Sequence, residues 1–258
     1  MALRKTQDSI GGVLLAQIML VASGKGGVGK STVTCAISQV LTKMGKRVLI
    51  IDGDAGLRCQ DILLDLTDSV ILDWGDVLCG NEEAENAVIA KEGKPHLLPA
   101  PLIWAPEWTA EEFKKMTDRL SENYDYVFID APAGVGPGLA LLARSAKMAI
   151  IVSGSEAAGI RGACAAGDVL KGLGVVSRRL VINSVRPELI RKGILPNLDS
   201  VIDRTELRLI GVLPFDEDIN RGAAAGELKL DEKSLYLKAA TALSLRVTGK
   251  NVPITKFR

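Results

Sequence analysis

Short apolar runs rich in β-branched residues recur along the chain and predict buried strands. There are seven of them: Ile18–Ala22, Val48–Asp52, His96–Pro99, Tyr126–Asp130, Met148–Ser153, Leu180–Val185 and Leu209–Leu213. Most are nearly continuously apolar rather than alternating, which is typical of parallel strands that are covered on both faces.

The segments between these runs carry helical periodicity. Ahead of Gly45, apolar residues recur at helical spacing and predict one buried helix face: Val33, Ala36, Ile37, Val40, Leu41 and Met44. Thr109 and Glu112 have the spacing of a capping box at the start of another helix, whose stripe is Phe113, Met116 and Leu120. A last stripe runs from Tyr236 to Val247 and stops before Gly249.

Alternating strands and helices predict an α/β fold with a doubly wound, mostly parallel sheet flanked by helices. No repeat, low-complexity tract or flexible linker divides the chain, so we expect one domain over residues 17–253. Residues 1–16 would be an N-terminal extension or the product of an upstream start site. Residues 254–258 would be a short tail.

Composition and charge exclude several classes of protein. Hydrophobic residues make up 47% of the 258 residues and aromatic residues only 4%, which favours an aliphatic core. A net charge of +1 gives no overall attraction to nucleic acid, and we expect no nucleic-acid partner. The four cysteines, Cys35, Cys59, Cys79 and Cys164, form no close pair, which disfavours a zinc or iron–sulfur site. Free thiols and the lack of a signal peptide predict a cytoplasmic protein.

One segment between the first strand and the first helix has the residue types of a phosphate-binding loop. Its sequence is Gly24-Lys25-Gly26-Gly27-Val28-Gly29-Lys30-Ser31, which satisfies G-x-x-x-x-G-K-[ST] in the strand–loop–helix context that the motif requires. The glycines let successive N–H groups face phosphate oxygens, and the helix adds the positive end of its dipole. We expect Lys30 to reach the β- and γ-phosphates and Ser31 to ligate Mg²⁺. A dinucleotide-binding interpretation fits less well, because this lysine suits a triphosphate.

The loop also resembles that of a particular family. With Ser23 and Thr32 at its ends and Lys25 directly after the first glycine, it resembles the deviant Walker A motif of the MinD/ParA ATPases. These are P-loop NTPases of the SIMIBI class, and within the family the chain resembles the MinD branch. There the early lysine reaches the phosphates of a partner subunit across a nucleotide-sandwich dimer. The resemblance therefore implies an ATPase that uses ATP and Mg²⁺, with an ATP-dependent homodimer in which Lys25 acts in trans.

Two acidic segments begin at the C-terminal ends of predicted strands and strengthen the resemblance. Asp52-Gly53-Asp54-Ala55-Gly56-Leu57-Arg58 resembles switch I of MinD, and Asp130-Ala131-Pro132-Ala133-Gly134-Val135 resembles its switch II. Ligands of open α/β sheets bind at this end of the strands, where carboxylates can hold metal-bound waters or orient an attacking water. The resemblance assigns the water to Asp54 and places Asp52 and Asp130 on the Mg²⁺ side. Lys25, Lys30 and Asp54 would be the catalytic residues.

Later segments match the family more loosely. Asn183 follows the apolar residues Leu180–Ile182 of a predicted strand and corresponds to the asparagine that recognises adenine in the family. An amide can pair with both a donor and an acceptor on the base edge. Pro214 lies in a run that resembles the adenine-side turn. With Thr32 and the loop residues 24–31, these two complete the predicted nucleotide site. Glu156 and Arg161 occupy the positions of an E…R pair of the family.

The chain also departs from MinD. After Gly-Leu-Arg, MinD has Asn-Leu-Asp, whereas this chain has Cys59-Gln60-Asp61. Positions that are polar in MinD, near a surface used by its partner proteins, are small here: Ala158, Gly159, Gly162 and Ala163. The tail of five residues, 254–258, is too short for the basic amphipathic membrane helix of MinD, so we expect no strong direct membrane binding through it. A partner could still hold the protein at the membrane.

The resemblance implies a slowly hydrolysing, dimeric ATPase switch that positions or regulates a protein partner, such as the machinery of cell division at the septum site. One alternative is an ATP-dependent metallocluster maturation or metal-delivery factor, although such proteins typically use paired cysteines. Another is a flagellar-number regulator of the same superfamily. A relative of the bacterial tyrosine kinases is disfavoured, since none of the three tyrosines lies in the tail. The sequence does not identify the effector.

Two further features have a structural interpretation. His96, the single histidine, has no Cys, His or Glu at ligand spacing and is expected to be structural. Trp104 and Trp108 flank Pro106, and we expect them to pack a loop onto the sheet, with an exposed patch for a partner as the alternative.

Overall fold

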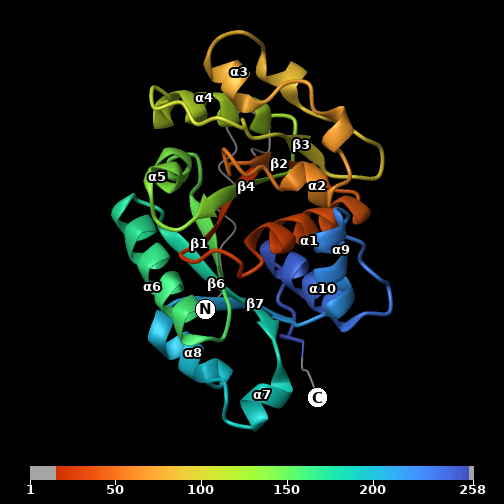
Figure 1. Ribbon diagram of the computed structural model, residues 1–258, viewed down its shortest axis with the longest axis vertical. Helices are drawn as coiled ribbons and strands as arrows, with labels where there is room; N and C mark the ends of the chain where they lie inside the picture. Colours follow the sequence, from red (N-terminus) through yellow and green to blue (C-terminus); the bar gives the residue numbers. More distant parts are fainter. Residues whose placement is uncertain (1–15, 256–258) are drawn as a thin grey trace.

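The computed structural model describes residues 16–255 and contains one parallel sheet of seven strands (Figure 1). The strands are β1 (Gln17–Ser23), β2 (Val48–Asp52), β3 (His96–Leu98), β4 (Tyr126–Ala133), β5 (Met148–Ser153), β6 (Ser177–Val185) and β7 (Arg208–Pro214). Their order across the sheet is β3-β2-β4-β1-β5-β6-β7. Each predicted apolar run corresponds to one of these strands, so the predicted fold class is confirmed.

Helices connect the strands and cover both faces of the sheet. They are α1 (Lys30–Lys43), α2 (Gln60–Leu63), α3 (Trp74–Leu78), α4 (Ala110–Ser121), α5 (Pro137–Ala143), α6 (Ala157–Gly172), α7 (Pro187–Arg191), α8 (Leu198–Thr205), α9 (Glu217–Ala225) and α10 (Leu235–Val247), with 3-10 turns at Thr67–Ser69 and Ala84–Ala87. As the sequence indicated, α4 begins directly after Thr109 and α10 ends before Gly249.

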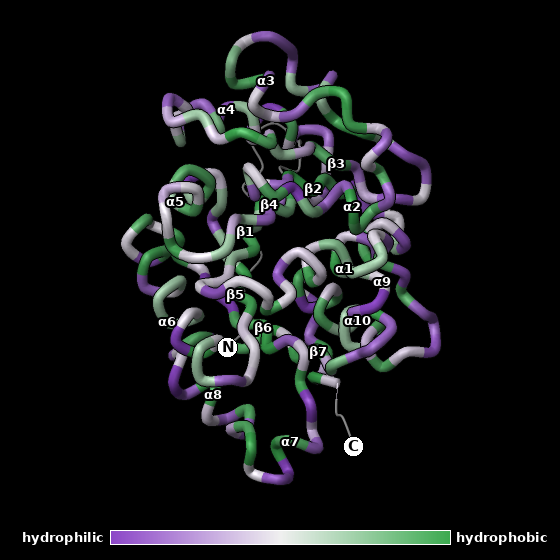
Figure 2. Tube along the Cα trace, in the orientation of Figure 1, coloured by the Kyte–Doolittle hydropathy of each residue, from purple (hydrophilic) through white to green (hydrophobic). Residues whose placement is uncertain are grey.

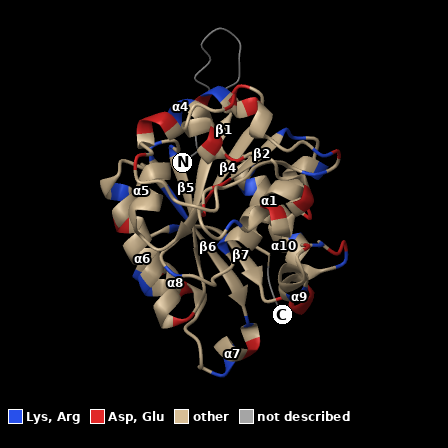
Figure 3. Cartoon of the chain, turned by 45° about the horizontal axis from the view of Figure 1, so that its top comes forward, with Lys and Arg blue, Asp and Glu red and all other residues tan. Residues whose placement is uncertain are grey.

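The central strand β1 contributes alternate side chains to two separate cores. Leu20 and Ala22 pack on the side of α4, α5 and α6, whereas Met19 and Val21 pack on the side of α1 and α10. Figure 2 shows hydrophobic residues along the central strands and hydrophilic stretches in many outer connections, and Figure 3 shows acidic and basic residues interspersed around the periphery. Both faces of the sheet are therefore buried, as continuous apolar strands require.

The start of α4 agrees with the sequence, whereas one residue at the end of α1 does not. The capping box is present: Thr109 N–H donates to the Glu112 carboxylate at 3.1 Å, and Glu112 N–H donates to Thr109 Oγ1 at 3.2 Å. The prediction that Met44 lies on the buried face of α1 was wrong. The helix ends at Lys43, and Met44 is 39% exposed in the turn that leads to Gly45.

Strand register brings the two acidic segments together. β2 and β4 are adjacent, and Asp52 lies directly opposite Asp130. β1 pairs with the other side of β4, with Val21 opposite Asp130 and Ser23, the last residue before the loop, opposite Ala133. The sheet thus collects the predicted phosphate loop and both acidic segments at the carboxyl ends of its central strands.

Candidate functional site

The loop between β1 and α1 contains two backbone conformations that favour glycine. Gly27 and Gly29 have φ values of 79° and 83°, in the left-handed region that glycine adopts without strain. Gly29 immediately precedes α1, and no side chain caps the first turn of this helix. The first N–H groups of a helix have no partner within it, so this end of α1 can receive an anion.

Helix α6 supports the start of the loop through a glycine–glycine contact. A Cβ atom added to Gly24 would lie 1.9 Å from the carbonyl oxygen of Gly162. Main chains can approach this closely only when neither residue carries a side chain. Gly162, noted in the sequence as a departure from MinD, therefore fixes where the phosphate loop begins.

Lys30 is the buried cation of the site. Its side chain is 6% exposed, and its Nζ donates to Asp130 Oδ1 at 2.8 Å and to Ser31 Oγ at 3.1 Å. Burial by itself lowers the pKa of this ammonium group. The charge and hydrogen bond of Asp130, with further charge from Asp54 and Asp52, outweigh burial and raise the pKa above its usual value. Lys30 is therefore held as an ammonium ion in contact with Ser31.

Asp130 is fully buried and accepts hydrogen bonds from three other residues. Besides Lys30, Thr34 Oγ1 donates to its Oδ1 at 3.2 Å, and Gln60 Nε2 donates to its Oδ2 at 2.7 Å. Thr34 belongs to α1 and Gln60 to α2. Asp130 therefore joins the phosphate-loop helix to the segment that follows β2.

Asp52 is also fully buried and organises the first acidic segment. Its Oδ1 accepts from Asp54 N–H at 3.0 Å, and its Oδ2 accepts from the N–H groups of Cys59 at 2.9 Å and Gln60 at 2.8 Å. Burial, followed by the charge of Asp130, raises the pKa of Asp52 to about 7, even though the N–H groups of Gln60 and Asp54 oppose the shift. Two neighbouring buried carboxylates of this kind would be stabilised by a divalent cation.

Asp54 is only partly buried. Burial raises the pKa of its carboxyl group, the charge of Lys30 opposes that shift, and the charge of Asp130 adds to it. Asp54 thus lies within electrostatic range of the same cluster while remaining partly open to solvent.

Lys25 lies apart from the buried network. Its Nζ is 3.0 Å from Glu156 Oε1, and both side chains are more than 40% exposed. Glu156 immediately precedes α6. The two loop lysines therefore have different environments, because Lys30 is buried on Asp130 whereas Lys25 is at the surface.

Asn183 and Pro214 line a small hollow beside the loop. Gly27, Gly29 and Thr32 also line it. Asn183 is 3% exposed; its Nδ2 donates to the carbonyl oxygen of Val28 at 2.9 Å, while its Oδ1 is buried without a hydrogen-bond partner among the described residues. A buried amide oxygen without a partner fits an incoming amino donor such as that of adenine.

The predicted site residues thus lie at or near the carboxyl ends of five strands, with the phosphate loop between them. Val28 contributes its carbonyl oxygen, whereas its side chain is buried in the core. Sequence reasoning missed the roles of Gln60 and Trp74. The Trp74 indole N–H donates to the Asp52 carbonyl oxygen at 2.7 Å. For Gln60, the sequence indicated only a polar residue at a position where MinD has leucine. For Trp74, the sequence indicated no role.

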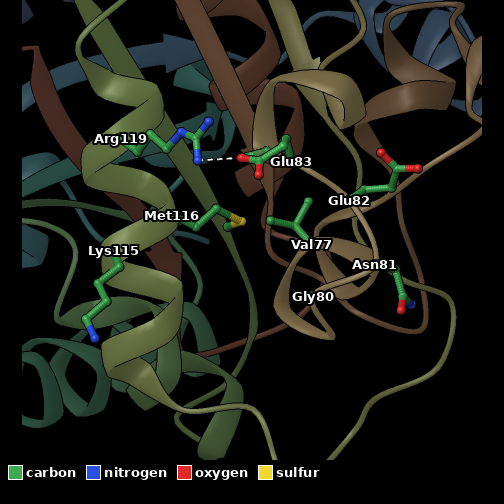
Figure 4. Close-up of a pocket in the computed structure, with 9 residues that line it drawn as sticks. Val77, Gly80, Asn81, Glu82, Glu83, Lys115, Met116 and Arg119 are labelled. Atoms are coloured by element: carbon green, nitrogen blue, oxygen red, sulfur yellow. Dashed lines mark ion pairs between the residues drawn. The ribbon is translucent and has the colours of Figure 1, made fainter.

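A larger hollow of about 500 Å³ lies elsewhere, between the end of α3 and α4 (Figure 4). Val77 and Met116 line it and point toward one another, and Arg119 of α4 pairs with Glu83 at 2.5 Å. None of the predicted site residues lines this hollow.

Within residues 16–255, no helix has the length and hydropathy needed to cross a bilayer. The same residues contain no group of three or more His, Cys, Asp or Glu side chains arranged to hold a metal ion. Residues 1–15 of the predicted extension and residues 256–258 of the predicted tail lie outside the described part of the chain.

A glycine-rich loop at a helix start, a buried lysine and two acidic strand ends define a P-loop nucleotide-binding protein. The family described as the CobQ/CobB/MinD/ParA nucleotide binding domain matches residues 19–230. The putative septum site-determining protein MinD of Emiliania huxleyi is 34% identical over 249 residues, which cover 94% of this chain and 91% of the relative. The septum site-determining protein MinD of a Synechocystis strain is 31% identical over 246 residues, covering 93% and 92%.

Solved structures agree with these relatives. The MinC:MinD cell division protein complex of Aquifex aeolicus matches with a TM-score of 0.86 and 31% identity, covering 94% of this chain and 99% of that one. MinD from Pyrococcus horikoshii, complexed with Mg-ADP, matches with a TM-score of 0.81 and 27% identity, covering 90% and 96%. The chain belongs to the MinD/ParA family of nucleotide-binding proteins. The predicted resemblance is confirmed, the expected cofactors ATP and Mg²⁺ agree with it, and the metal-delivery alternative is not favoured.

Proposed function

We propose that this protein is an ATP-binding and slowly ATP-hydrolysing switch that dimerises when it holds ATP and then binds a protein effector. The observation that carries the proposal is the contact between Lys30 and Asp130 at 2.8 Å. It joins the group expected to bind the terminal phosphates to the acidic segment expected to sense them.

The residues present fit a Mg²⁺–nucleotide. The loop glycines and the uncapped start of α1 suit the phosphates, and the unpartnered Oδ1 of Asn183 suits the base. Lys30 and Ser31 would bind the β- and γ-phosphate side, with Asp52 and Asp130 on the side of the metal. The cation would supply neutralisation of the charge that develops on the transferred phosphoryl group.

Competition for Lys30 provides a physical route from phosphate to shape. A γ-phosphate within reach of Lys30 competes with Asp130 for the ammonium group. Asp130 accepts hydrogen bonds from both Lys30 and Gln60, so a change in the position of Lys30 would be transmitted to both acidic segments. A ligand shifts such an equilibrium only through contacts that differ between the two states, and ATP and ADP differ at this position.

Lys25 is the residue proposed to act on a partner subunit. Its ion pair with Glu156 is exposed, and exposed pairs contribute about 1 kcal/mol or less. Exchange of Glu156 for a phosphate group of a second subunit is therefore energetically accessible. Asp54 would orient the attacking water. Slow turnover is expected because the sequence indicates no arginine finger in addition to the two loop lysines.

The cellular role follows from the relatives and is part of the proposal. Several relatives are described as septum site-determining proteins, and one solved relative is in a complex with MinC. We infer a protein effector of the division machinery. The alternative role of a flagellar-number regulator is not favoured by these relatives. The protein is expected to be cytoplasmic and to reach the membrane through its partner.

Two measurements test the proposal. Calorimetric titration should show Mg²⁺-dependent ATP binding that Lys30→Ala abolishes. The Asp54→Ala variant should bind ATP but not hydrolyse it, and with ATP it should retain an effector that the ADP-bound protein does not. Hydrolysis at an unchanged rate in Asp54→Ala would remove the proposed role of this residue, and ATP binding by Lys30→Ala with unchanged affinity would contradict the site.

A further inference from the structure

Gln60 is a fully buried amide that contacts three separate parts of the site. It is the first residue of α2, and its relative exposure is 0%. We propose that Gln60 is a positioning residue that fixes the two aspartates against the phosphate loop and thereby sets the Mg²⁺ affinity of the site. This inference rests on the proposed function, because it concerns how the same site binds its metal ion.

The contacts of Gln60 bridge the two acidic segments and the loop. Its main-chain N–H donates to Asp52 Oδ2 at 2.8 Å. Its side-chain Nε2 donates to Asp130 Oδ2 at 2.7 Å and to the main-chain oxygen of Ser31 at 3.1 Å. A single residue thus contacts one aspartate through its backbone, the other through its side chain, and the residue expected to ligate Mg²⁺.

The side-chain contact becomes more important once Lys30 turns toward phosphate. Lys30 and Thr34 both donate to Asp130 Oδ1, whereas Gln60 provides the hydrogen bond to Oδ2. A buried carboxylate that loses donors is costly, and its orientation is no longer fixed. Gln60 keeps Asp130 oriented while the lysine is engaged elsewhere.

The other end of the amide has no partner. Gln60 Oε1 is buried and accepts no hydrogen bond from any described residue. A hydrated cation brings O–H donors into a site of this kind, and an amide oxygen can accept one of them. Partners that orient metal ligands in this way typically change metal affinity about 10- to 100-fold when they are removed.

The sequence provides a natural comparison. The pattern of MinD has leucine at the position of Gln60, and leucine can form none of these side-chain hydrogen bonds. The Gln60→Leu variant therefore tests how much the side-chain amide contributes to the Mg²⁺ affinity of this chain. Gln60→Met preserves the length and approximate volume of the side chain. An effect shared by both variants therefore comes from the lost hydrogen bonds and not from a packing defect at this buried position.

The experiment measures ATP binding with a fluorescent ATP analogue while Mg²⁺ is titrated from an EDTA-buffered start. Gln60→Leu and Gln60→Met should each raise the Mg²⁺ concentration for half-maximal binding about tenfold. Analogue binding in EDTA should change much less. Hydrogen exchange without nucleotide should be faster in the segment 52–63 of both variants, because α2 loses its side-chain bonds to Asp130 and Ser31.

Gln39→Leu is the matched control. Gln39 also donates from its Nε2, at 3.0 Å to the Leu228 carbonyl oxygen, but this contact lies outside the aspartate cluster. Its Mg²⁺ requirement should equal that of the unchanged protein. The inference is overturned if a folded Gln60→Met variant has that same requirement. If the unchanged protein binds ATP equally well with and without Mg²⁺, the proposed function loses its metal ion. That outcome is distinct from an unchanged Mg²⁺ requirement in Gln60→Met, which overturns only the role of Gln60.

Discussion

Lys25 and Glu156 form an ion pair at 3.0 Å that holds the second loop lysine on its own subunit. Lys25 comes from the phosphate loop, and Glu156 is the residue before α6. Since both side chains are about half exposed, the pair holds the lysine only weakly. The ion pair thus keeps Lys25 at the surface of the chain, where the proposed second subunit would reach it.

Glu156→Gln should release Lys25 and favour the ATP-bound dimer. The variant removes the charge that competes with the partner's phosphates, so the dimer should form at a lower protein concentration with ATP. Sedimentation velocity across a concentration series measures this shift. Glu85→Gln removes a comparable exposed partner, that of Arg119 at 2.8 Å, and should leave the dimer unchanged. A weaker dimer in Glu156→Gln would show that the carboxylate supports the interface instead of competing with it.

Gly162→Ala should disturb the phosphate loop although the residue lies on another element. Its new Cβ would lie 2.9 Å from the carbonyl carbon of Gly24 and 3.1 Å from the Lys25 nitrogen. We expect weaker ATP binding, while α6 itself gains up to about 1 kcal/mol of helix propensity. Gly172→Ala, on the same helix with open space around it, should leave ATP binding unchanged. Calorimetry on both variants distinguishes these outcomes, and equal ATP affinities would refute the contact's role.

Asn183→Leu should weaken adenine nucleotide binding about tenfold, because the loss of a buried amide pairing costs about 1–3 kcal/mol. The variant keeps the size of the side chain but loses the bond to the Val28 carbonyl oxygen and the free Oδ1. Asn251→Leu, at an exposed position, is the control. Titration with ADP measures the effect. Unchanged ADP affinity in Asn183→Leu would remove Asn183 from the base site.

His96 should titrate below pH 6.5, because partial burial lowers the pKa of its imidazole. It lies beside the Tyr124 hydroxyl, 2.9 Å from Nδ1. Below pH 6.5 the unfolded chain binds a proton that the folded chain does not yet bind, so the free energy of unfolding should fall as pH falls through this window. As the single histidine, it gives one set of imidazole proton NMR signals. His96→Gln should remove this part of the pH dependence, and titration above pH 6.5 would contradict the burial argument.

The sequence predicted the strands and the phosphate loop well, because both depend on local patterns. Continuous apolar runs located each strand, and the motif located Lys30 between a strand and a helix. The prediction also placed Asp52 and Asp130 at the same edge of the sheet, and the register sets them opposite each other. Short helices such as α2 and α7 were not predicted, since four or five residues carry too little periodicity.

The contacts inside the site could not be predicted for a different reason. Gln60 reaches Asp130 across 70 positions of the chain, and Trp74 reaches the Asp52 carbonyl oxygen across 22. Such pairs depend on how α2 and α3 pack against the sheet, and neither residue belongs to a motif. Trp104 and Trp108 also could not be told apart from the sequence. Trp108 is buried, with its ring centroid 4.6 Å from that of Trp74, whereas Trp104 is 37% exposed.

The most direct test of the switch is the mass of the protein in solution with ATP and with ADP, measured by multi-angle light scattering. In the hydrolysis-blocked Asp54→Ala background, ATP should double the mass from that of one 27.4 kDa chain, and ADP should not. Adding Lys25→Ala should abolish the dimer, whereas Lys171→Ala, an exposed lysine near the far end of α6, should preserve it. An ATP-dependent dimer that forms equally well without Lys25 would contradict the shared site.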